Sequence, residues 1–500
     1  MKSDNDGGGR KKSQADQLVE IAAMADLFHA RDETGYADIE VNGHRETWAI
    51  RSRDFRRWLA FRYFEATGGA ASSEALHAAI NVIEARAQFD GPTRAVHIRI
   101  GEEGGRVYLD LCDEQWRAVE VDTSGWRVID RPPVRFRRTA GMLPLPTPIR
   151  GGSIELLRPF VNVRGDADFV LSVAWLLAAL RGCGPYPVLA LSGEQGAAKS
   201  TFAAILRALV DPKTPPLRAL PREDRDLFIA ATNGHVLAFD NISSLPAWTS
   251  DTFCRLATGG GFAVRRLYSD QDEILFDAVR PVILNGITDV VTRPDLADRT
   301  LFLTLEAIPD ECRRPEADLW KEFRARRPRI LGALLDATAE GLRNLPKTKL
   351  ERLPRMADFA LWATACESAM WSAGSFSAAY DGNREEAIED VLDADPVTAA
   401  VRAFIAERMS WSGTASQLLN VLAGEVEDRV TRSKAWPQSA RPLSARLRRG
   451  ATFLRKVGIA VDFAREGPGG RRVISIIKHP SVAKFASAAS PPSAAVAAEE

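Results

Sequence analysis

The sequence is poor in cysteine, and the few cysteines that it has stand far apart. There are five in 500 residues, at positions 112, 183, 254, 312 and 366. Isolated cysteines form neither a C-x-x-C metal motif nor a disulfide framework. We therefore expect no zinc site, a reducing compartment, and thiols that act as small buried apolar groups.

The sequence also lacks an excess of charge and a long apolar run. Its 66 Lys and Arg residues balance 66 Asp and Glu residues, so any argument for a nucleic-acid partner must come from local charge. No segment reaches the roughly 18 uncharged apolar residues that span a bilayer. The start, MKSDNDGGGRKKSQ, has no signal-peptide core. We expect a cytoplasmic protein with no membrane partner.

A chain of this length predicts several domains. Composition and periodicity divide it into a disordered arm (1–13), an α+β domain (14–141), a Pro-rich linker (142–152), an α/β core (153–310), a helical region (311–395), a second small domain (396–479) and a disordered tail (480–500). In the core, strands alternate with helices, which predicts a mostly parallel sheet.

The N-terminal domain is the hardest part to interpret. A helical period covers 14–29, strands are expected over 37–50, and helices over 52–67 and 73–89. Asp110 and Asp113 raise the alternative of a primase or polymerase with paired carboxylates on a metal ion, but the D-x-D pattern is absent because position 112 is Cys. The stretch RSRDFRRWLAFRYF (51–64) is basic and aromatic. It fits DNA contact or a docking face, although aromatic side chains there are more typical of a core.

The most informative stretch is LALSGEQGAAKST (189–201). An apolar strand leads into a glycine-bearing loop and then into a helix, which is the context that a phosphate-binding loop requires. Its backbone N–H groups would cradle phosphates, Lys199 would reach the terminal ones, and Ser200 would bind Mg²⁺. The nucleotide-binding residues are then Gly193, Glu194, Gln195, Gly196, Ala197, Ala198, Lys199, Ser200 and Thr201.

One position of this loop departs from the motif G-x-x-x-x-G-K-S/T, because Ala198 stands where glycine is expected. A Cβ atom is tolerated there if φ is negative. We expect Ala198 to begin the helix with negative φ, at little energetic cost.

A carboxylate follows the next apolar strand, GHVLAFDN (234–241). Asp240 ends this strand and would hold Mg²⁺ through water, although such an Asp also caps helices. Hydrolases commonly place a second acid next, but here the residue is Asn241. Either Glu194 or Asp226 assists the attacking water, or hydrolysis is slow.

A polar residue and an arginine complete the set. The strand RPVILNGI (280–287) ends in Asn285, which is suited to sense the γ-phosphate. Arg299 precedes another strand, and such an arginine often acts on the nucleotide of a neighbouring subunit. Arg293 is the alternative. For either arginine a surface ion pair with Asp295 or Asp298 is the simpler interpretation.

In this order, and with LATGGGFAVRRLY (256–268) between Asp240 and Asn285, these elements resemble the superfamily 3 helicase core. That AAA+-like group occurs in phage, plasmid and virus replication proteins. The chain also looks like the "ATP-binding protein" type of phage-derived and integrative elements, akin to the C-terminal halves of primase-helicases. The resemblance implies a basic hairpin in a ring pore, with Arg265 and Arg266 facing DNA; a solvated basic turn is the alternative.

The C-terminal domain has the pattern of a winged helix. Three helical periods, the second capped by Thr414, are followed by a hairpin with a Gly-Pro-Gly-Gly turn. Residues 431–478 carry twelve Lys or Arg and two Asp or Glu, an asymmetry that suggests nucleic acid. A protein-docking winged helix is the alternative. The expected DNA contacts here are Arg446, Arg449, Lys456, Arg471 and Arg472.

We therefore expect an α/β protein built on a P-loop NTPase (AAA+-like) parallel-sheet core, with an N-terminal α+β domain and a C-terminal winged-helix-like domain. The expected activity is an ATPase that uses ATP and Mg²⁺ in a homo-oligomeric ring, a hexamer, around single-stranded or forked DNA. Its role would be helicase or translocase in phage or mobile-element replication. The alternatives are an ATP-switched DNA-binding regulator and a scaffold that recruits a primase or polymerase.

Overall fold

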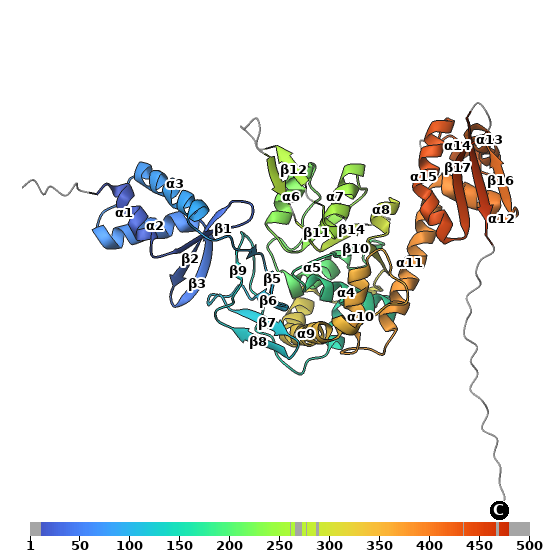
Figure 1. Ribbon diagram of the computed structural model, residues 1–500. Helices are drawn as coiled ribbons and strands as arrows, with labels where there is room; N and C mark the ends of the chain where they lie inside the picture. The colour runs from blue at the N-terminus through green and yellow to red at the C-terminus, as the bar shows by residue number, and fades with distance from the viewer. Residues whose placement is uncertain are drawn as a thin grey trace, which may run out of the picture. The chain divides into compact units, whose positions relative to one another are not determined.

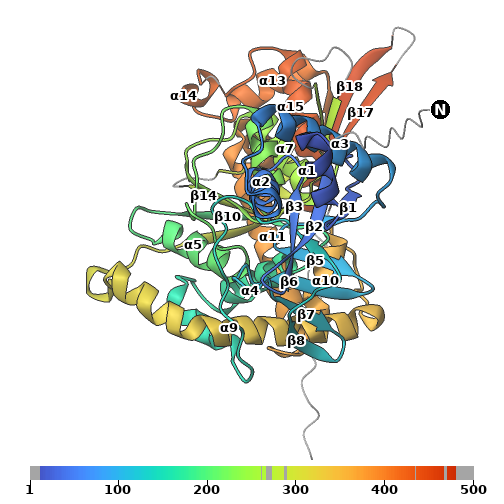
Figure 2. The ribbon, with the colours of Figure 1, turned by 90° about the vertical axis from the view of Figure 1, so that its left-hand side faces the viewer.

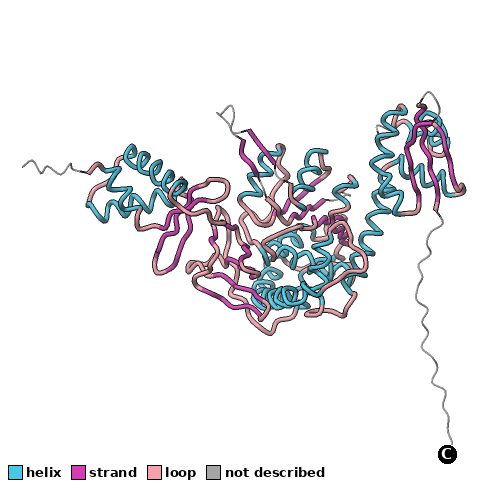
Figure 3. The backbone as a smooth tube through the Cα atoms, viewed as in Figure 1, coloured by secondary structure: helices cyan, strands magenta, loops and turns pink. Residues whose placement is uncertain are grey.

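The computed structural model describes residues 12–260, 262–265, 273–276, 278–286, 290–433, 435–466 and 470–479, with backbone only for 262–265 and 273–276. The chain divides into two compact units, 1–384 and 385–500. Most of the arm and all of the tail expected to be disordered lie outside the described residues. Figures 1 and 3 trace the helices and strands of both units.

Unit 1 begins with a small module, residues 14–89, which we call the N-terminal module. Its elements are α1 (Gln14–Ala22), β1 (Asp26–His29), β2 (Gly35–Val41), β3 (His44–Ala49), α2 (Arg53–Thr67) and α3 (Ser73–Phe89). The strands form an antiparallel sheet in the order β1-β2-β3. The prediction of one helix over 14–29 is wrong at its end, because Leu27 lies in β1 and pairs with Ala37.

A four-stranded antiparallel sheet follows the N-terminal module. Its strands are β5 (Ile100–Glu103), β6 (Arg106–Asp110), β7 (Ala118–Asp122) and β8 (Gly125–Ile129), and a separate parallel pair joins β4 (Val96–His97) to β9 (Arg135–Phe136). The helix α9 (Glu316–Asn344) packs beside β7 and β8 (Figure 2).

The Pro-rich segment 142–152 is packed rather than a free linker. Leu145 is buried, and its N–H donates to the Leu111 carbonyl at 2.9 Å. The N–H of Ile149 donates to the Pro328 carbonyl of α9, also at 2.9 Å. One continuous hydrophobic core contains residues from Ile100 to Tyr380, so the expected boundary at 141 does not separate two cores.

The centre of unit 1 is a four-stranded parallel sheet, in the order β11-β14-β10-β15. The strands are β10 (Val188–Gly193), β11 (Leu237–Ile242), β14 (Val282–Gly286) and β15 (Thr300–Leu305). Figure 1 shows β10, β11 and β14 together with α5 (Lys199–Val210), which contacts all three. Strand interiors such as Leu189 and Ile283 are fully buried, as expected for parallel strands covered on both faces. The expectation of a mostly parallel sheet is confirmed.

Helices and short 3-10 turns complete unit 1. They are η1 (Ile154–Phe160), α4 (Asp166–Ala179), α6 (Asp224–Thr232), α7 (Ala247–Thr258), α8 (Pro294–Ala297), η2 (Asp310–Cys312), η3 (Leu345–Lys347), α10 (Ala357–Glu367) and α11 (Ser375–Ala394), which crosses into unit 2. The strands β12 (Phe262–Arg265) and β13 (Glu273–Phe276) pair antiparallel between α7 and β14. In the described residues no helix is long and apolar enough to cross a membrane.

A buried cluster of charged groups connects the region of the antiparallel sheet with that of the parallel sheet. Arg99 and Asp211 are fully buried, with Nε and Oδ1 3.1 Å apart. Asp211 also accepts the N–H of His235 at 3.0 Å and that of Val236 at 3.1 Å. Burial lowers the pKa of His235 to about 4 and the pKa of Lys213 to about 8. Through its bonds to the His235 and Val236 N–H groups, Asp211 fixes the position of the start of β11 by contacts between residues distant in the sequence.

Unit 2 combines helices with a three-stranded antiparallel sheet in the order β16-β18-β17. Its elements are α12 (Pro396–Ala406), β16 (Ser410–Gly413), α13 (Ala415–Gly424), α14 (Asp428–Thr431), α15 (Ala440–Lys456), β17 (Ile459–Glu466) and β18 (Arg471–Lys478). Thr414 caps α13 in a capping box with Gln417, as the sequence predicts. The three main helices and the hairpin follow in the expected order, and most of the Gly-Pro-Gly-Gly turn lies outside the described residues.

The expectation of buried thiols is only partly right. Cys366 is buried, whereas Cys183 and Cys312 are exposed. The Asp110 and Asp113 carboxylates are engaged with arginines: Asp110 accepts from Arg138 at 2.8 Å and Asp113 from Arg117 at 2.6 Å. Both acids therefore act within ion pairs of the antiparallel sheet region.

Candidate functional site

The glycine-bearing loop stands between β10 and α5, as the sequence predicts. Gly193 has φ 140°, and a Cβ atom there would lie 2.2 Å from the Leu305 carbonyl oxygen of β15. Only glycine avoids both the strain and the clash. The next loop residues, Glu194, Gln195 and Gly196, are exposed at the end of the sheet.

Ala198 contradicts the expectation of negative φ. It has φ 57° and ψ 29°, a left-handed conformation, and it is the N-cap of α5 instead of its first residue. Left-handed backbone costs an L-residue with a Cβ atom about 1–2 kcal/mol. The glycine of the motif avoids this cost, so alanine at position 198 makes the loop conformation less favourable than glycine would.

Lys199 is half-buried and folded back onto its own loop. Its Nζ donates to the carbonyl oxygens of Gly193 at 2.9 Å and Glu194 at 2.8 Å. These partners are neutral backbone groups at the rim of the loop. Phosphate oxygens carry negative charge, so they would bind the same ammonium group more strongly than these neutral carbonyls do.

Three side chains from different elements meet beside Lys199. Ser200 Oγ donates to Asp240 Oδ1 at 3.1 Å. Asn285 Nδ2 donates to Ser200 Oγ at 3.1 Å and to Asp240 Oδ1 at 2.5 Å. Asn285 is 1% exposed and sits at the end of the central strand β14. The sequence predicts that these groups belong to one site, and the structure brings them together.

Asn241 follows Asp240 in a left-handed conformation, φ 57°, within a break in the register of β11. Its backbone N–H donates to Asp240 Oδ1 at 2.8 Å, and its side chain is exposed. Neither Glu194 nor Asp226 is hydrogen-bonded to Ser200, Asp240 or Asn285 in the described part of the chain. The geometry thus offers one carboxylate, Asp240, to a metal ion.

A cavity of about 600 Å³ adjoins the loop. The loop residues Gly196, Ala198 and Thr201 form one wall, while η1 with its following turn and the segment 306–319 form the others. Asn162 holds these walls together, because its Nδ2 donates to Ala197 O at 3.1 Å and to Glu306 O at 2.7 Å. Sequence reasoning missed this cavity, since 159–162 and 306–319 carry no motif.

The two candidate arginines are bound within their own chain. Arg299 Nη1 donates to the Asp295 carbonyl of α8 and lies 3.8 Å from Cys254 Sγ, while its buried Nε has no hydrogen-bond partner among the described residues. Arg293 pairs with Asp251 at 2.9 Å, and not with Asp295 or Asp298. The structure places neither in contact with Lys199 or Asp240.

The structure describes the side chains of only some of the expected DNA-binding residues. Arg265 ends β12, opposite Glu273, but its side chain and all of Arg266 lie outside the described residues. In unit 2, Arg449 and Arg472 are exposed. Arg446 lies 3.6 Å from Asp395, Arg471 lies 3.4 Å from Gln417, and Lys456 lies over the Phe453 ring.

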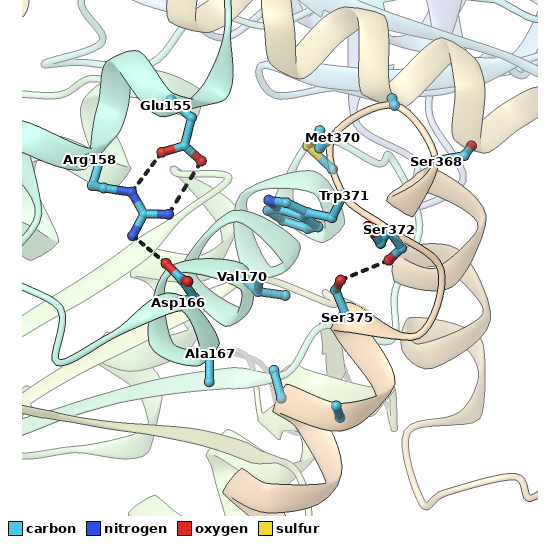
Figure 4. Close-up of a pocket in the computed structure, with 13 residues that line it drawn as sticks. Glu155, Arg158, Asp166, Ala167, Val170, Ser368, Met370, Trp371, Ser372 and Ser375 are labelled. Atoms are coloured by element: carbon cyan, nitrogen blue, oxygen red, sulfur yellow. Dashed lines mark hydrogen bonds and ion pairs between the residues drawn. The ribbon is translucent and has the colours of Figure 1, made fainter. Parts of the chain in front are cut away.

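A second cavity of unit 1, of about 960 Å³, lies between η1, α4 and the turn before α11 (Figure 4). Arg158 is held there by Glu155 at 2.7 Å and by Asp166 at 3.0 Å. Trp371 lies across from them. Because two carboxylates offset the charge of Arg158, this cavity offers little attraction to an anionic ligand.

Two family models match the sequence. The model described as "Actinomycete integrative conjugative element replication protein" matches residues 154–390, and the one described as "AICE RepA C-terminal domain" matches residues 397–491. No curated protein matches. Two solved structures of the apo C-terminal region of NrS-1 are similar at 12% and 10% identity. Each comparison covers 94% of this chain and 100% of that chain, at a TM-score of 0.40.

Proposed function

Because the chain belongs to the replication proteins of actinomycete integrative conjugative elements, we propose that its parallel-sheet site binds ATP with Mg²⁺ and hydrolyses it to act on DNA. The observation that carries this proposal is the meeting of Ser200, Asp240 and Asn285 at 2.5–3.1 Å beside the Lys199 loop. In this proposal the core is a P-loop NTPase of the AAA+ type.

Each residue has a role that its contacts support. Hydroxyl and carboxylate oxygens suit Mg²⁺, so Ser200 and Asp240 would hold it, and the ion would neutralise phosphate charge. Lys199 would exchange its two carbonyl partners for phosphate oxygens. Asn285 is buried and hydrogen-bonded to Ser200 and Asp240, so its amide would sense whether the γ-phosphate is bound. The cavity of about 600 Å³ is where the nucleoside would lie.

A nucleotide-binding measurement tests the site. Titration with a fluorescent ATP analogue and Mg²⁺ should saturate the wild-type chain, and Lys199→Ala should weaken binding at least about tenfold, because charge-assisted bonds to phosphate are lost. Lys349→Ala is the matched control, since this exposed lysine lies far along the chain in a loop. Equal binding by all three proteins refutes the assignment.

The finer proposal is a ring, a hexamer, that translocates on DNA as a helicase, with Arg299 acting on the neighbouring subunit. Arg299→Ala should then retain nucleotide binding and lower turnover by about 10³-fold. Mixing Arg299→Ala with Lys199→Ala should restore part of the activity, because one variant keeps the nucleotide site and the other keeps the arginine. If the mixture stays inactive, Arg299 does not act on the neighbouring subunit. The same experiment is then done with Arg293→Ala.

The second candidate function is an ATP-controlled switch or scaffold that recruits a primase or polymerase. Asn241 favours it, because an amide cannot take a proton from the attacking water. Tight binding of ATP combined with turnover that DNA does not change would favour this candidate over the motor.

A further inference from the structure

The N-terminal module lies outside both family matches, and one of its helices carries an unusual surface. On α2, Phe55, Leu59 and Tyr63 are spaced four residues apart and are 0%, 0% and 5% exposed. They form the side of the helix that faces the core of the module. The opposite side, about half a helical turn away, is therefore not needed for packing.

Phenylalanines occupy that opposite side. Phe61 is 58% exposed and Phe64 is 55% exposed. Among the described residues the exposed phenylalanines are these two and Phe89, all within the N-terminal module. Residues three apart on a helix are surface neighbours, with Cβ atoms about 5–6 Å apart. The two rings thus form one aromatic patch.

Arginines continue this patch toward the start of α2. Arg53, Arg57 and Phe61 follow one another at four-residue steps, so they lie along one face. Arg53, Arg56 and Arg57 are exposed and take part in no ion pair in the described part of the chain. By contrast, Arg51 pairs with Glu84, and Arg62 pairs with Glu65 at 2.8 Å. The one carboxylate of α2 outside these pairs is Asp54.

We propose that this surface, formed by Arg53, Arg57, Phe61 and Phe64, binds single-stranded DNA. Exposed rings stack on unpaired bases of any sequence, and adjacent guanidinium groups bind the phosphates between them. A duplex hides the faces of its bases, so the two rings would have no base to stack on. The free positive charge favours a nucleic acid over an apolar protein partner. The proposal is independent of the nucleotide site.

Photo-crosslinking of the full chain tests the contact directly. A short oligothymidylate substituted with 5-iodouracil should crosslink to the peptide that contains Phe61 and Phe64. Crosslinks confined to other peptides, such as those of α15, overturn the proposal.

Fluorescence anisotropy of a labelled oligothymidylate gives the second arm. The double variant Phe61→Ala, Phe64→Ala should bind at least about tenfold more weakly, since each stacked base contributes about 1–3 kcal/mol. Phe61→Tyr with Phe64→Tyr should bind as the wild type does, because tyrosine also stacks. Phe89→Ala, which removes a still more exposed ring from α3, is the control.

Three results count against a single-strand site. The first is that the double alanine variant binds the oligothymidylate as tightly as the wild type does. The second is that this variant loses as much affinity for a duplex of the same length as for the single strand. The third is that the variant, without DNA, sediments differently from the wild type while its affinity for DNA is unchanged. The last would show that the patch joins two copies of the chain.

Discussion

One buried group of arginines in unit 1 and one exposed group in unit 2 lie in opposite environments. In unit 1, Arg99 and Arg207 are 0% and 1% exposed and surround the carboxylate of Asp211. In unit 2, Arg449 and Arg472 are exposed on α15 and β18. Buried cations fix the fold because their partners cannot be replaced by water, whereas exposed cations stay available to phosphate.

Lys199 lies between these extremes. It is half-buried, and within the described part of the chain its Nζ is bonded to the Gly193 and Glu194 carbonyls alone. An incoming phosphate can replace such partners without leaving a buried charge unpaired. The cluster at Asp211 thus has a structural role, and under the proposed function Lys199 would exchange ligands and the exposed arginines would contact DNA.

The largest expected effect is at the buried cluster. Asp211→Asn removes the charge that offsets Arg99 and Arg207, and should lower the free energy of unfolding by about 3–5 kcal/mol, as when one partner of a buried ion pair is lost. Urea unfolding followed by circular dichroism measures it. Glu65→Gln is the control, because its ion pair with Arg62 is exposed and is worth at most about 1 kcal/mol. Equal losses in the two variants would contradict the structural role of the cluster.

A smaller effect is expected at the exposed arginines. Arg449→Ala and Arg472→Ala should each reduce the slope of log affinity for DNA against log salt by about one, since one phosphate contact is lost. Arg446→Ala should change it less, because Arg446 lies 3.6 Å from Asp395 and is 27% exposed. The affinity of each variant for DNA, measured over a series of salt concentrations, gives the three slopes. A flat salt response of the wild type would show instead that unit 2 docks a protein.

The smallest effect concerns Ala198. Ala198→Gly should raise the free energy of unfolding by about 1 kcal/mol, because it relieves the left-handed conformation at φ 57°. Ala204→Gly, in the middle of α5, should lower it by about 1 kcal/mol. Urea unfolding of both variants measures the two changes. If both glycines destabilise the protein, the backbone at Ala198 is not left-handed in solution.

Local patterns made much of this fold predictable. The helices over 53–67 and 73–89 and the Thr414 cap of α13 follow from residues close together in the sequence. The parallel sheet and the meeting of Asp240 with Asn285 also follow, because parallel strands end at one edge and carry their last residues there.

The remaining features depend on contacts that the sequence does not display. Arg99 and Asp211 are 112 residues apart, and no spacing rule connects them. The wall of the cavity at 306–319 lies beyond the last motif. The left-handed conformation of Ala198 arises where a strand, a loop and a helix must join, so the alanine alone gives no sign of it. Phe61 and Phe64 are apolar, and only packing decides that they face water.

We propose that unit 1 hydrolyses ATP in response to DNA. The most direct test is steady-state ATP hydrolysis with and without single-stranded DNA, for the wild type and for Lys199→Ala. We expect strong stimulation by DNA in the wild type and none in the variant. Tight ATP binding with negligible turnover that DNA does not change would contradict the motor, and would leave the site formed by Asp240 and Asn285 as a switch.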